Sequence, residues 1–392
     1  MSTIEKIKKR LQLDWLEFLS KNSAKLNSNV VSGASPPSLF VGHKGYPRVN
    51  LGPLVPPIHG NTSIFDCPEA WTGRTIQQIV KFRMNLIRGM VRLNVFNPSG
   101  TYIETLQEMA LSLLPVESTV TFAKNPLPRD ISSSSNTAII PSMLAADVTD
   151  FRPSKIRIDP RIEKIYYDTD ILSTDAIFGL YVKGVTINQI SKILSIGMIG
   201  RKKHRKLVPT KWSLTATDQT ISNALIGSIK HYESIDSLQL FSYSHVENRY
   251  WVILIPNYTW SFEMVEAWRG EDLKIAIGSD YEDFDGLSRY PSIAGAYYAG
   301  RLAVAEYLHK MRRAATVLIL REILPEYILP VGVWQIREGI RMALKNRPLI
   351  FDDIQSMLTF VNSRSSVPMF KWLMGSKTLK QSKAQTKMTD FF

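Results

Sequence analysis

Segments with a regular hydrophobic period alternate along this chain with segments rich in glycine, proline and serine. Near the N-terminus, apolar side chains recur every three or four residues among Lys and Glu, which predicts an amphipathic helix over residues 4–19. This helix could lie on a membrane surface, but its apolar face is narrow, so we expect it to pack on the protein itself. Residues 21–38, which follow, have the composition of a polar linker.

The strongest helical pattern in the first half of the chain covers residues 75–93, where apolar residues mark one face. Arg74, Lys81 and Arg88 recur every seven residues and are therefore expected to share the opposite face. A basic stripe of this kind is typical of a solvated surface, and contact with DNA is the alternative that the sequence leaves open. Further along, residues 122–142 predict a flexible loop.

Residues 238–255 carry the clearest β pattern, because two runs of aromatic and β-branched residues with a period of two flank a short polar link. This arrangement predicts a β-hairpin, and residues 258–268 and 315–320 predict further strands. Helices are expected over residues 292–313, 333–345 and 352–362. Helices and strands mix without a regular βα alternation, so the predicted fold class is α+β, with the hairpin as part of a sheet.

Composition narrows the class of protein. The chain has 392 residues, of which 44% are hydrophobic and 21% charged, which is ordinary for a globular protein and long enough for two domains. Its formal charge of +13 suits a polyanionic partner such as nucleic acid, or an anionic membrane surface, although excess Lys and Arg can also serve solubility alone. The single cysteine, Cys67, excludes a disulfide within the chain and indicates a reducing, cytoplasmic compartment. No signal peptide and no apolar run of about 20 residues is recognisable.

A dense basic segment, "GRKKHRKLVPTKW", follows a helix that is predicted over residues 184–199. It contains six basic residues and ends on a tryptophan: Arg201, Lys202, Lys203, Arg205, Lys206, Lys211 and Trp212. Positive charge beside an aromatic ring suits a surface that follows the phosphate backbone and stacks on bases. These residues are therefore candidates for DNA binding, together with the basic stripe on residues 75–93.

The glycine- and proline-rich residues 39–57 predict either a long ordered loop or a set of short strands. Their glycines do not connect a strand to a helix, so a dinucleotide-binding fingerprint is not supported. His43, Lys44 and Arg48 could bind phosphate, and a solvated loop is an equally good interpretation of this segment.

Four acids within residues 280–285 suggest an alternative function, a metal-dependent nuclease that acts on damaged DNA. Such an enzyme needs carboxylates that converge on Mg²⁺ or Mn²⁺. The weak candidates for metal ligands are Asp280, Glu282, Asp283 and Asp285. Acid clusters are mostly solvated loops, so we expect no metal, no cofactor and no catalytic residue, and we favour a factor without enzymatic activity. Cys67 suits a small buried side chain better than a nucleophile.

The chain ends on "QTKMTDFF", behind the Lys- and Ser-rich "GSKTLKQSKA", which has the composition of an unstructured linker. In a 3₁₀ turn, residues three apart project from the same side, so Met388 and Phe391 would form one apolar plug with Phe392 beside them. Gln385 could then bind the rim of a hydrophobic pocket. This pattern resembles the PIP box, the peptide that docks on the sliding clamp PCNA.

Longer segments carry a second resemblance. They are "SPPSLFVGHKGYPRVNLGPLVPP", "FDCPEAW", "RKLVPTKWSLTATDQTIS" and "YPSIAGAYYAGRLAVAEYL". These segments resemble the archaeal Nre family of DNA repair proteins. The resemblance implies a role in the response to DNA damage and a terminal PIP motif, which here is Gln385, Met388, Phe391 and Phe392.

The resemblance also implies a domain organisation. After a helix and linker in residues 1–34, it predicts an N-terminal Nre domain over 35–283, a C-terminal Nre domain over 284–373 and a flexible tail over 374–392. Many family members carry a four-cysteine zinc finger near the N-terminus, but residues 1–34 contain no cysteine, so no zinc finger is expected here. We therefore expect a factor whose partners are DNA and PCNA and not a membrane.

Overall fold

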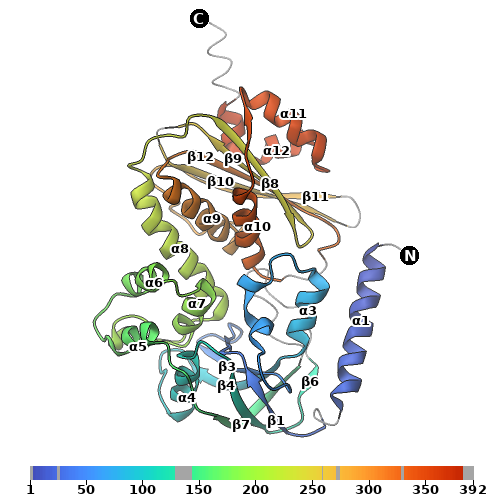
Figure 1. Ribbon diagram of the computed structural model, residues 1–392, viewed down its shortest axis with the longest axis vertical. Coiled ribbons are helices and arrows are strands. Elements are labelled where there is room, and N and C mark those ends of the chain that lie inside the picture. Colours follow the sequence, from blue (N-terminus) through green and yellow to red (C-terminus); the bar gives the residue numbers. More distant parts are fainter. Residues whose placement is uncertain are drawn as a thin grey trace, which may run out of the picture. The chain divides into compact units, whose positions relative to one another are not determined.

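Two β-sheets organise the residues that the structure describes, one in each of two units of the chain (Figure 1). The computed structural model describes residues 3–23, 27–128, 144–257, 259–270, 274–327 and 331–382. The first unit contains the residues up to Ile221 together with 331–332, and the second contains the rest. This mixture of helices with two mixed sheets confirms the predicted α+β class. Within the described ranges, no helix is both long and apolar enough to cross a membrane.

The sheet of the first unit has the strand order β1-β5-β7-β4-β3-β2, and β6 pairs with β7. β4 and β7 run parallel, whereas the other neighbouring strands run antiparallel. The strands are β1 (Val30–Ser35), β2 (Leu39–Val41), β3 (Arg48–Val55), β4 (Ile87–Asn94), β5 (Val116–Phe122), β6 (Leu127–Pro128) and β7 (Leu144–Pro153).

Two segments near the N-terminus, residues 21–38 and 39–57, contribute strands to this sheet. The linker predicted over residues 21–38 is wrong at β1, which pairs with β5 and buries Val31 and Ala34. The glycine- and proline-rich residues 39–57 form the antiparallel pair β2 and β3, which confirms the prediction of short strands. The loop predicted over residues 122–142 begins at the end of β5, and 129–143 lie outside the described residues.

The helices of the first unit include the predicted N-terminal helix, α1, which packs against α3 and buries Leu11 and Phe18. The helix predicted over residues 184–199 is also confirmed, in the shorter form of α7. The helical elements are α1 (Thr3–Lys21), η1 (Ser63–Asp66), η2 (Pro68–Ala70), α3 (Ile76–Met84), α4 (Thr101–Ala110), α5 (Pro160–Tyr167), α6 (Ser173–Val182), α7 (Ile187–Ser195) and η3 (Lys202–His204). α8 (Thr210–Ile229) contains the boundary between the two units.

The long helix predicted over residues 75–93 is wrong in its second half. α3 begins with a capping box at Thr75 and ends at Met84, and the chain then turns into β4. Gly89 makes this strand possible, because a Cβ at that position would lie only 2.6 Å from Val148 Cγ2 of the neighbouring β7. The basic stripe does not exist, since Arg88 is a buried residue of β4 rather than a neighbour of Lys81 on one helix.

The sheet of the second unit has the order β11-β10-β12-β9-β8-β13, in which only the β10–β12 pair is parallel within the described residues. The predicted hairpin is confirmed as β8 and β9, and its link uses positive φ angles of 46° at Val246 and 56° at Glu247, as a tight two-residue turn requires. The predicted strands at 258–268 and 315–320 are confirmed as β10 and β12. The strands are β8 (Leu238–His245), β9 (Asn248–Ile255), β10 (Ser261–Arg269), β11 (Ile275–Glu282), β12 (Thr316–Ile323) and β13 (Leu349–Phe351).

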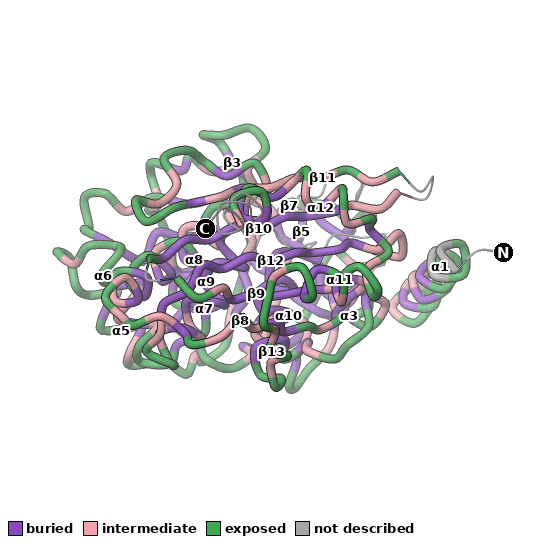
Figure 2. The backbone as a smooth tube through the Cα atoms, turned by 90° about the horizontal axis from the view of Figure 1, so that it is seen from above, coloured by how far each residue is buried: buried purple, intermediate pink, exposed green. Residues whose placement is uncertain are grey.

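Helices cover both faces of this second sheet (Figure 1). α9 and α10 pack on one face, where Met264 and Ile319 approach Gly300, and α11 and α12 cover the other. β12 lies between them and is buried along its whole length (Figure 2). The first three helices confirm the sequence predictions; the four are α9 (Gly295–Met311), α10 (Trp334–Lys345), α11 (Ile354–Arg364) and α12 (Met369–Gly375).

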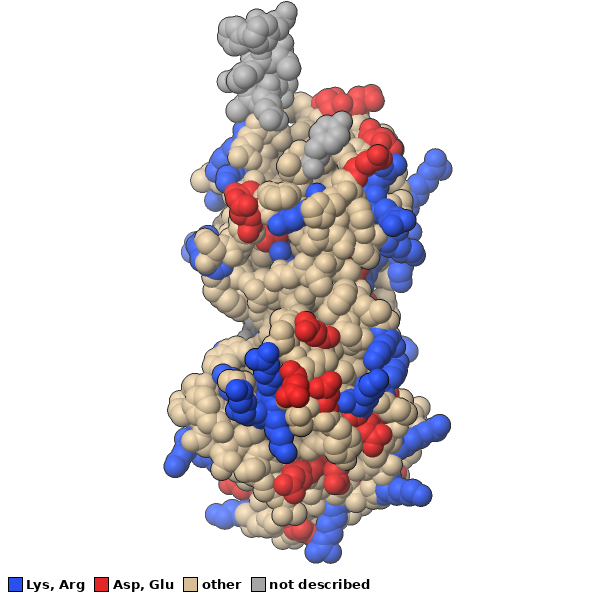
Figure 3. Space-filling view, turned by 90° about the vertical axis from the view of Figure 1, so that its left-hand side faces the viewer, with Lys and Arg blue, Asp and Glu red and all other residues tan. Residues whose placement is uncertain are grey.

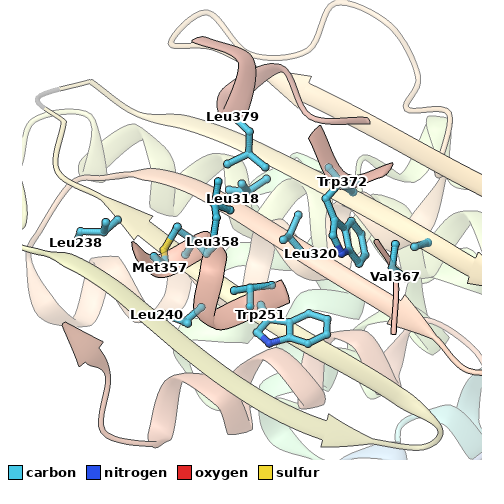
Figure 4. Packing of buried hydrophobic residues seen from close by; sticks show 14 residues of the cluster. Leu238, Leu240, Trp251, Leu318, Leu320, Met357, Leu358, Val367, Trp372 and Leu379 are labelled. Atoms are coloured by element: carbon cyan, nitrogen blue, oxygen red, sulfur yellow. The ribbon is translucent and has the colours of Figure 1, made fainter. Parts of the chain in front are cut away.

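The face under α11 and α12 holds an apolar core to which the end of the described chain contributes (Figure 4). Trp251 and Leu320 of the sheet pack there with Trp372 and Leu379. Residues 377–382 form a further helical turn, which Glu263 anchors by accepting hydrogen bonds from Lys377 N at 2.6 Å and Thr378 N at 2.9 Å. The unstructured linker predicted for "GSKTLKQSKA" is therefore wrong as far as residue 382, and the PIP-like residues 385–392 lie outside the described residues.

Candidate nucleic-acid interface

Three aromatic side chains from distant parts of the sequence meet on the surface of the first unit. Tyr46, Phe96 and Trp212 are 44%, 60% and 42% exposed, and together they are called the aromatic surface below. The ring centroid of Tyr46 lies 5.3 Å from that of Trp212 and 6.3 Å from that of Phe96. Aromatic rings that are this exposed and this close together usually indicate a binding site rather than a core.

The turn between β2 and β3 holds Tyr46 in place. Gly45 has a φ of +81°, and a Cβ there would lie 2.9 Å from the Arg48 carbonyl oxygen, so this tight turn favours glycine. The turn is closed by hydrogen bonds from Tyr46 N to His43 O at 3.3 Å and from Arg48 N to Gly45 O at 2.9 Å. The ring of Tyr46 is therefore presented by a short, fixed segment of backbone.

Backbone hydrogen bonds through Val95 connect the segments that carry the other two rings. Val95 N donates to Pro47 O at 3.0 Å, next to Tyr46, and Val95 O accepts from Leu207 N at 2.9 Å, ahead of α8. Phe96 follows Val95 directly and lies 60% exposed at the end of β4. Trp212 lies in the first turn of α8, whose Thr210 Oγ1 accepts a hydrogen bond from Val41 N at 2.9 Å. The fold thus fixes all three backbone positions.

Lysine and arginine side chains surround the aromatic surface. Lys206 Nζ lies 5.9 Å from the ring centroid of Phe96, and Lys211 Nζ lies 5.9 Å from that of Trp212. The exposed Arg92 lies beside the turn, because its guanidinium would be 3.0 Å from a Cβ on Gly45. Positive charge therefore lies over two of the three rings and beside the turn that carries the third.

His43, at the base of the turn, experiences this positive charge. Burial is the main cause that lowers the pKa of His43, and nearby cations lower it further: Lys211, Lys44 and Arg88. The imidazole is therefore neutral at pH 7, and a bound anion would be needed to favour its protonated form. Of the three residues that the sequence proposed as a phosphate site, His43 has both Lys44 and Lys211 nearby, and Arg48 is exposed at the start of β3.

Arg88 is buried, and it contributes positive charge near His43 without being part of the exposed surface. Its guanidinium carbon lies 4.3 Å from the ring centroid of Phe40, and Nη2 donates to the Asn50 carbonyl oxygen at 3.0 Å. Arg74 and Lys81, the other members of the predicted stripe, are both exposed. Arg74 lies just before α3, and Lys81 lies on α3 with its Nζ 3.9 Å from Asp14 Oδ1. The structure therefore separates these three candidates.

The basic segment 201–212 divides into two kinds of residue. Arg205 has a structural role, because its guanidinium donates to the carbonyl oxygens of Gly200, Tyr166 and Asp168 at 2.6–2.8 Å. The exposed basic members are Arg201, which precedes η3, Lys202 and Lys203 on η3, and Lys206. Lys211 and the exposed Trp212 lie in the first turn of α8. On the face drawn in Figure 3, basic side chains are interspersed with acidic ones.

The acids of residues 280–285 do not converge. Asp280 is buried and accepts hydrogen bonds from Ser292 Oγ and Ile293 N at 2.8 Å each, and Glu282 is buried beside Arg301 Nε at 2.7 Å. Asp283 accepts from the backbone of Asp285 at 3.1 Å. No group of three His, Cys, Asp or Glu side chains in the described ranges is arranged to hold a metal ion. The hydrogen bonds and the ion pair of Asp280 and Glu282 give these two carboxylates a structural role in the second unit.

Cys67 is half-buried, and burial, followed by the negative charge of Glu69, raises the pKa of its thiol. A thiol of this kind is a poor nucleophile at neutral pH.

Comparisons with known proteins cover nearly the whole chain. The family model described as "Archaeal Nre, N-terminal" matches residues 13–273, and "Archaeal Nre, C-terminal" matches residues 282–391. DNA repair protein NreB of Archaeoglobus fulgidus is 38% identical over 91% of this chain and 90% of its own length. DNA repair protein NreA of Haloferax volcanii is 32% identical over 85% of this chain and 83% of its own length. No solved structure matches the chain.

Proposed function

The chain belongs to the archaeal Nre family, and from this premise we propose that it is a cytoplasmic DNA repair factor that binds DNA through the first unit. We further propose that the sliding clamp PCNA recruits it through Gln385, Met388, Phe391 and Phe392. The relatives named DNA repair proteins NreA and NreB support the repair role. The two matched domain models account for most of the chain.

The observation that carries the proposed DNA binding is the aromatic surface with lysines at its edge. Lys206 and Lys211 each lie beside an exposed ring, and Lys44 and Lys211 both act on the same histidine. A chain with a net charge of +13 attracts a polyanion, and cations that neutralise phosphates release condensed counterions from DNA. Exposed rings next to such cations add contacts that a purely electrostatic surface lacks.

The clamp part of the proposal depends on the sequence of the tail. Met388, Phe391 and Phe392 supply apolar anchors of the kind that carry most of the energy of small interfaces. The described chain is anchored on the second unit at Lys377 and ends at residue 382, so only residues 383 and 384 separate it from the motif in the sequence. The two proposed activities therefore depend on different residues and can be separated by mutation.

DNA binding is expected to weaken steeply between about 50 and 200 mM salt, and replacing Lys206 and Lys211 by Gln is expected to reduce the slope of log affinity against log salt by about two. Each lysine that contacts a phosphate contributes about one to this slope, because its loss leaves one counterion on the DNA. Fluorescence anisotropy with a labelled oligonucleotide over a salt series measures the slope directly.

Lys6→Gln with Lys9→Gln is a matched control. It removes the same charge from exposed positions of α1, which packs against α3 and contributes no residue to the aromatic surface. This control should leave the slope within experimental error of the wild type. Equal slopes in the wild type and in the Lys206 and Lys211 double variant would refute the proposed interface, and the absence of DNA binding at low salt would refute DNA binding altogether.

A further inference from the structure

We propose that the aromatic surface binds unpaired bases of DNA, so that the first unit prefers single-stranded or locally unpaired DNA over continuous duplex. This inference rests on the proposed function and names the form of DNA that the same surface takes. Its support comes from the exposure of the three rings, from their mutual orientation and from the positions of the neighbouring cations.

A continuous duplex offers few partners for the exposed faces of these rings. In a duplex the base faces are stacked on each other, and a protein that approaches from outside meets phosphates, sugars and base edges. An exposed phenyl or indole face gains a partner only when a base is unpaired and can stack on it. Tyr46, Phe96 and Trp212 expose roughly half of their surface each, at 44%, 60% and 42%. This is apolar area that a nucleotide base would cover.

The rings are inclined to one another and do not stack face to face. The planes of Tyr46 and Trp212 meet at 59°, and those of Tyr46 and Phe96 at 74°. An edge-to-face arrangement of this kind uses the edge of one ring and leaves other faces available for stacking. Tyr46 contacts both of the other rings, so neighbouring nucleotides of one strand could reach all three.

The cations are placed where stacked nucleotides would carry their phosphates. Lys206 Nζ and Lys211 Nζ lie over the rings of Phe96 and Trp212, 5.9 Å from each centroid, so each ammonium is within reach of the phosphate of a nucleotide bound at that ring. Arg92 approaches the Tyr46 turn from β4. A base on a ring and its phosphate on the adjacent lysine would satisfy both the apolar and the charged parts of this surface at once.

The backbone that carries the rings is held in place, which reduces the entropy that binding would cost. Gly45 permits the turn at Tyr46, and the hydrogen bonds of Val95 link that turn to the segment ahead of α8. A surface of this kind resembles the preformed stacking platforms that bind single strands with little preference for sequence.

The experiment measures the affinity of the full chain for a mixed-sequence oligonucleotide of about 20 nucleotides, long enough for one single-strand site, and for the blunt duplex of the same sequence. At equal salt we expect the single strand to bind at least about ten-fold more tightly. Phe96→Ala and Trp212→Ala should each lower single-strand affinity roughly five- to hundred-fold, and duplex affinity less than about two-fold. Both side chains are exposed, so the variants should retain the wild-type melting temperature.

Phe370→Ala is the matched control, because Phe370 is 56% exposed and has Lys371 Nζ at 5.6 Å, but it belongs to α12 of the second unit. This variant should bind the single strand like the wild type. If Trp212→Ala is unstable, Trp212→Phe and Phe96→Ala still test the proposal, because Phe retains a stacking face and should lose less than Ala.

The possible outcomes separate the inference from the function on which it rests. Equal affinity for both DNA forms, with no effect of the ring variants, would overturn the inference and leave DNA binding intact. A ring variant that weakens both forms equally would also overturn it, since that result indicates a general contact. Binding to neither form would remove the proposed DNA binding itself.

Discussion

Replacing Asp66 by Ala is expected to lower the free energy of unfolding by about 3–5 kcal/mol, because two buried cations would lose their partner. The Asp66 carboxylate accepts hydrogen bonds from Arg83 and Ser38, and Lys192 Nζ lies 2.7 Å from its Oδ2. The side chains of Arg83 and Lys192 are only 4% and 8% exposed. The cluster joins η1, α3 and α7 with the segment ahead of β2, so its loss affects the packing of the whole first unit.

The destabilisation should also depend on pH. Burial alone would raise the pKa of Asp66, but Lys192 and Arg83 outweigh it and hold the pKa below its usual value. A carboxyl group whose pKa is lower in the folded state stabilises the protein above its unfolded pKa, about 3.9, and this contribution disappears as the pH falls through the folded pKa. The difference between wild type and Asp66→Ala should therefore shrink in acid. Urea unfolding near pH 7 and in acid measures both values.

Asp150→Ala is the control for the Asp66 prediction. Asp150 Oδ2 also lies 2.7 Å from its partner, Arg152 Nε, but both side chains are exposed, at 45% and 80%. An exposed pair contributes at most about 1 kcal/mol, so this variant should be nearly as stable as the wild type. Similar losses in both variants would show that burial of the Asp66 cluster does not determine its contribution.

Local patterns were sufficient to predict most elements of the second unit. The hairpin of β8 and β9 alternates aromatic and β-branched residues, and β12 contains the apolar run 317–320 and is buried along its whole length. Such patterns depend on the residues of one segment and its nearest neighbours. Local patterns failed where pairing with a distant segment determines the secondary structure. Residues 87–94 have a helical spacing of apolar residues, but they form a strand that pairs with β3 and β7. Asn85, which ends α3, and Gly89 were the local signals of that change.

The candidate interface could be predicted only in part for the same reason. Trp212 and its basic neighbours form one segment, so composition alone indicated a nucleic-acid surface there. Tyr46 and Phe96 come from turns in other parts of the chain and join Trp212 only through the fold. The one signal for Tyr46 was its position after Gly45 in a turn. Conversely, Arg205 looked like its basic neighbours in the sequence, and only its carbonyl partners reveal a structural role.

Replacing Phe391 and Phe392 by Ala is expected to abolish most measurable binding to PCNA. Truncation of buried aromatic anchors costs about 2 kcal/mol or more each, so two losses together correspond to a decrease of about a thousand-fold. Deleting residues 385–392 should have the same effect. Isothermal titration of the purified clamp with each variant measures the change, and an affinity equal to that of the wild type would refute the clamp-binding motif.

Two controls test whether the loss of PCNA binding comes from the motif itself or from unfolding of the protein. Thr386→Ala with Thr389→Ala changes the same tail at positions that the motif does not use, so clamp binding should persist. Deleting residues 385–392 should also leave the melting temperature unchanged, because Leu379 remains buried and Glu263 keeps its hydrogen bonds to Lys377 and Thr378.

The double Phe variant should bind DNA like the wild type, whereas Trp212→Ala should bind the clamp like the wild type. A variant that lost both activities would show that clamp docking and DNA binding are not carried by separate parts of the chain.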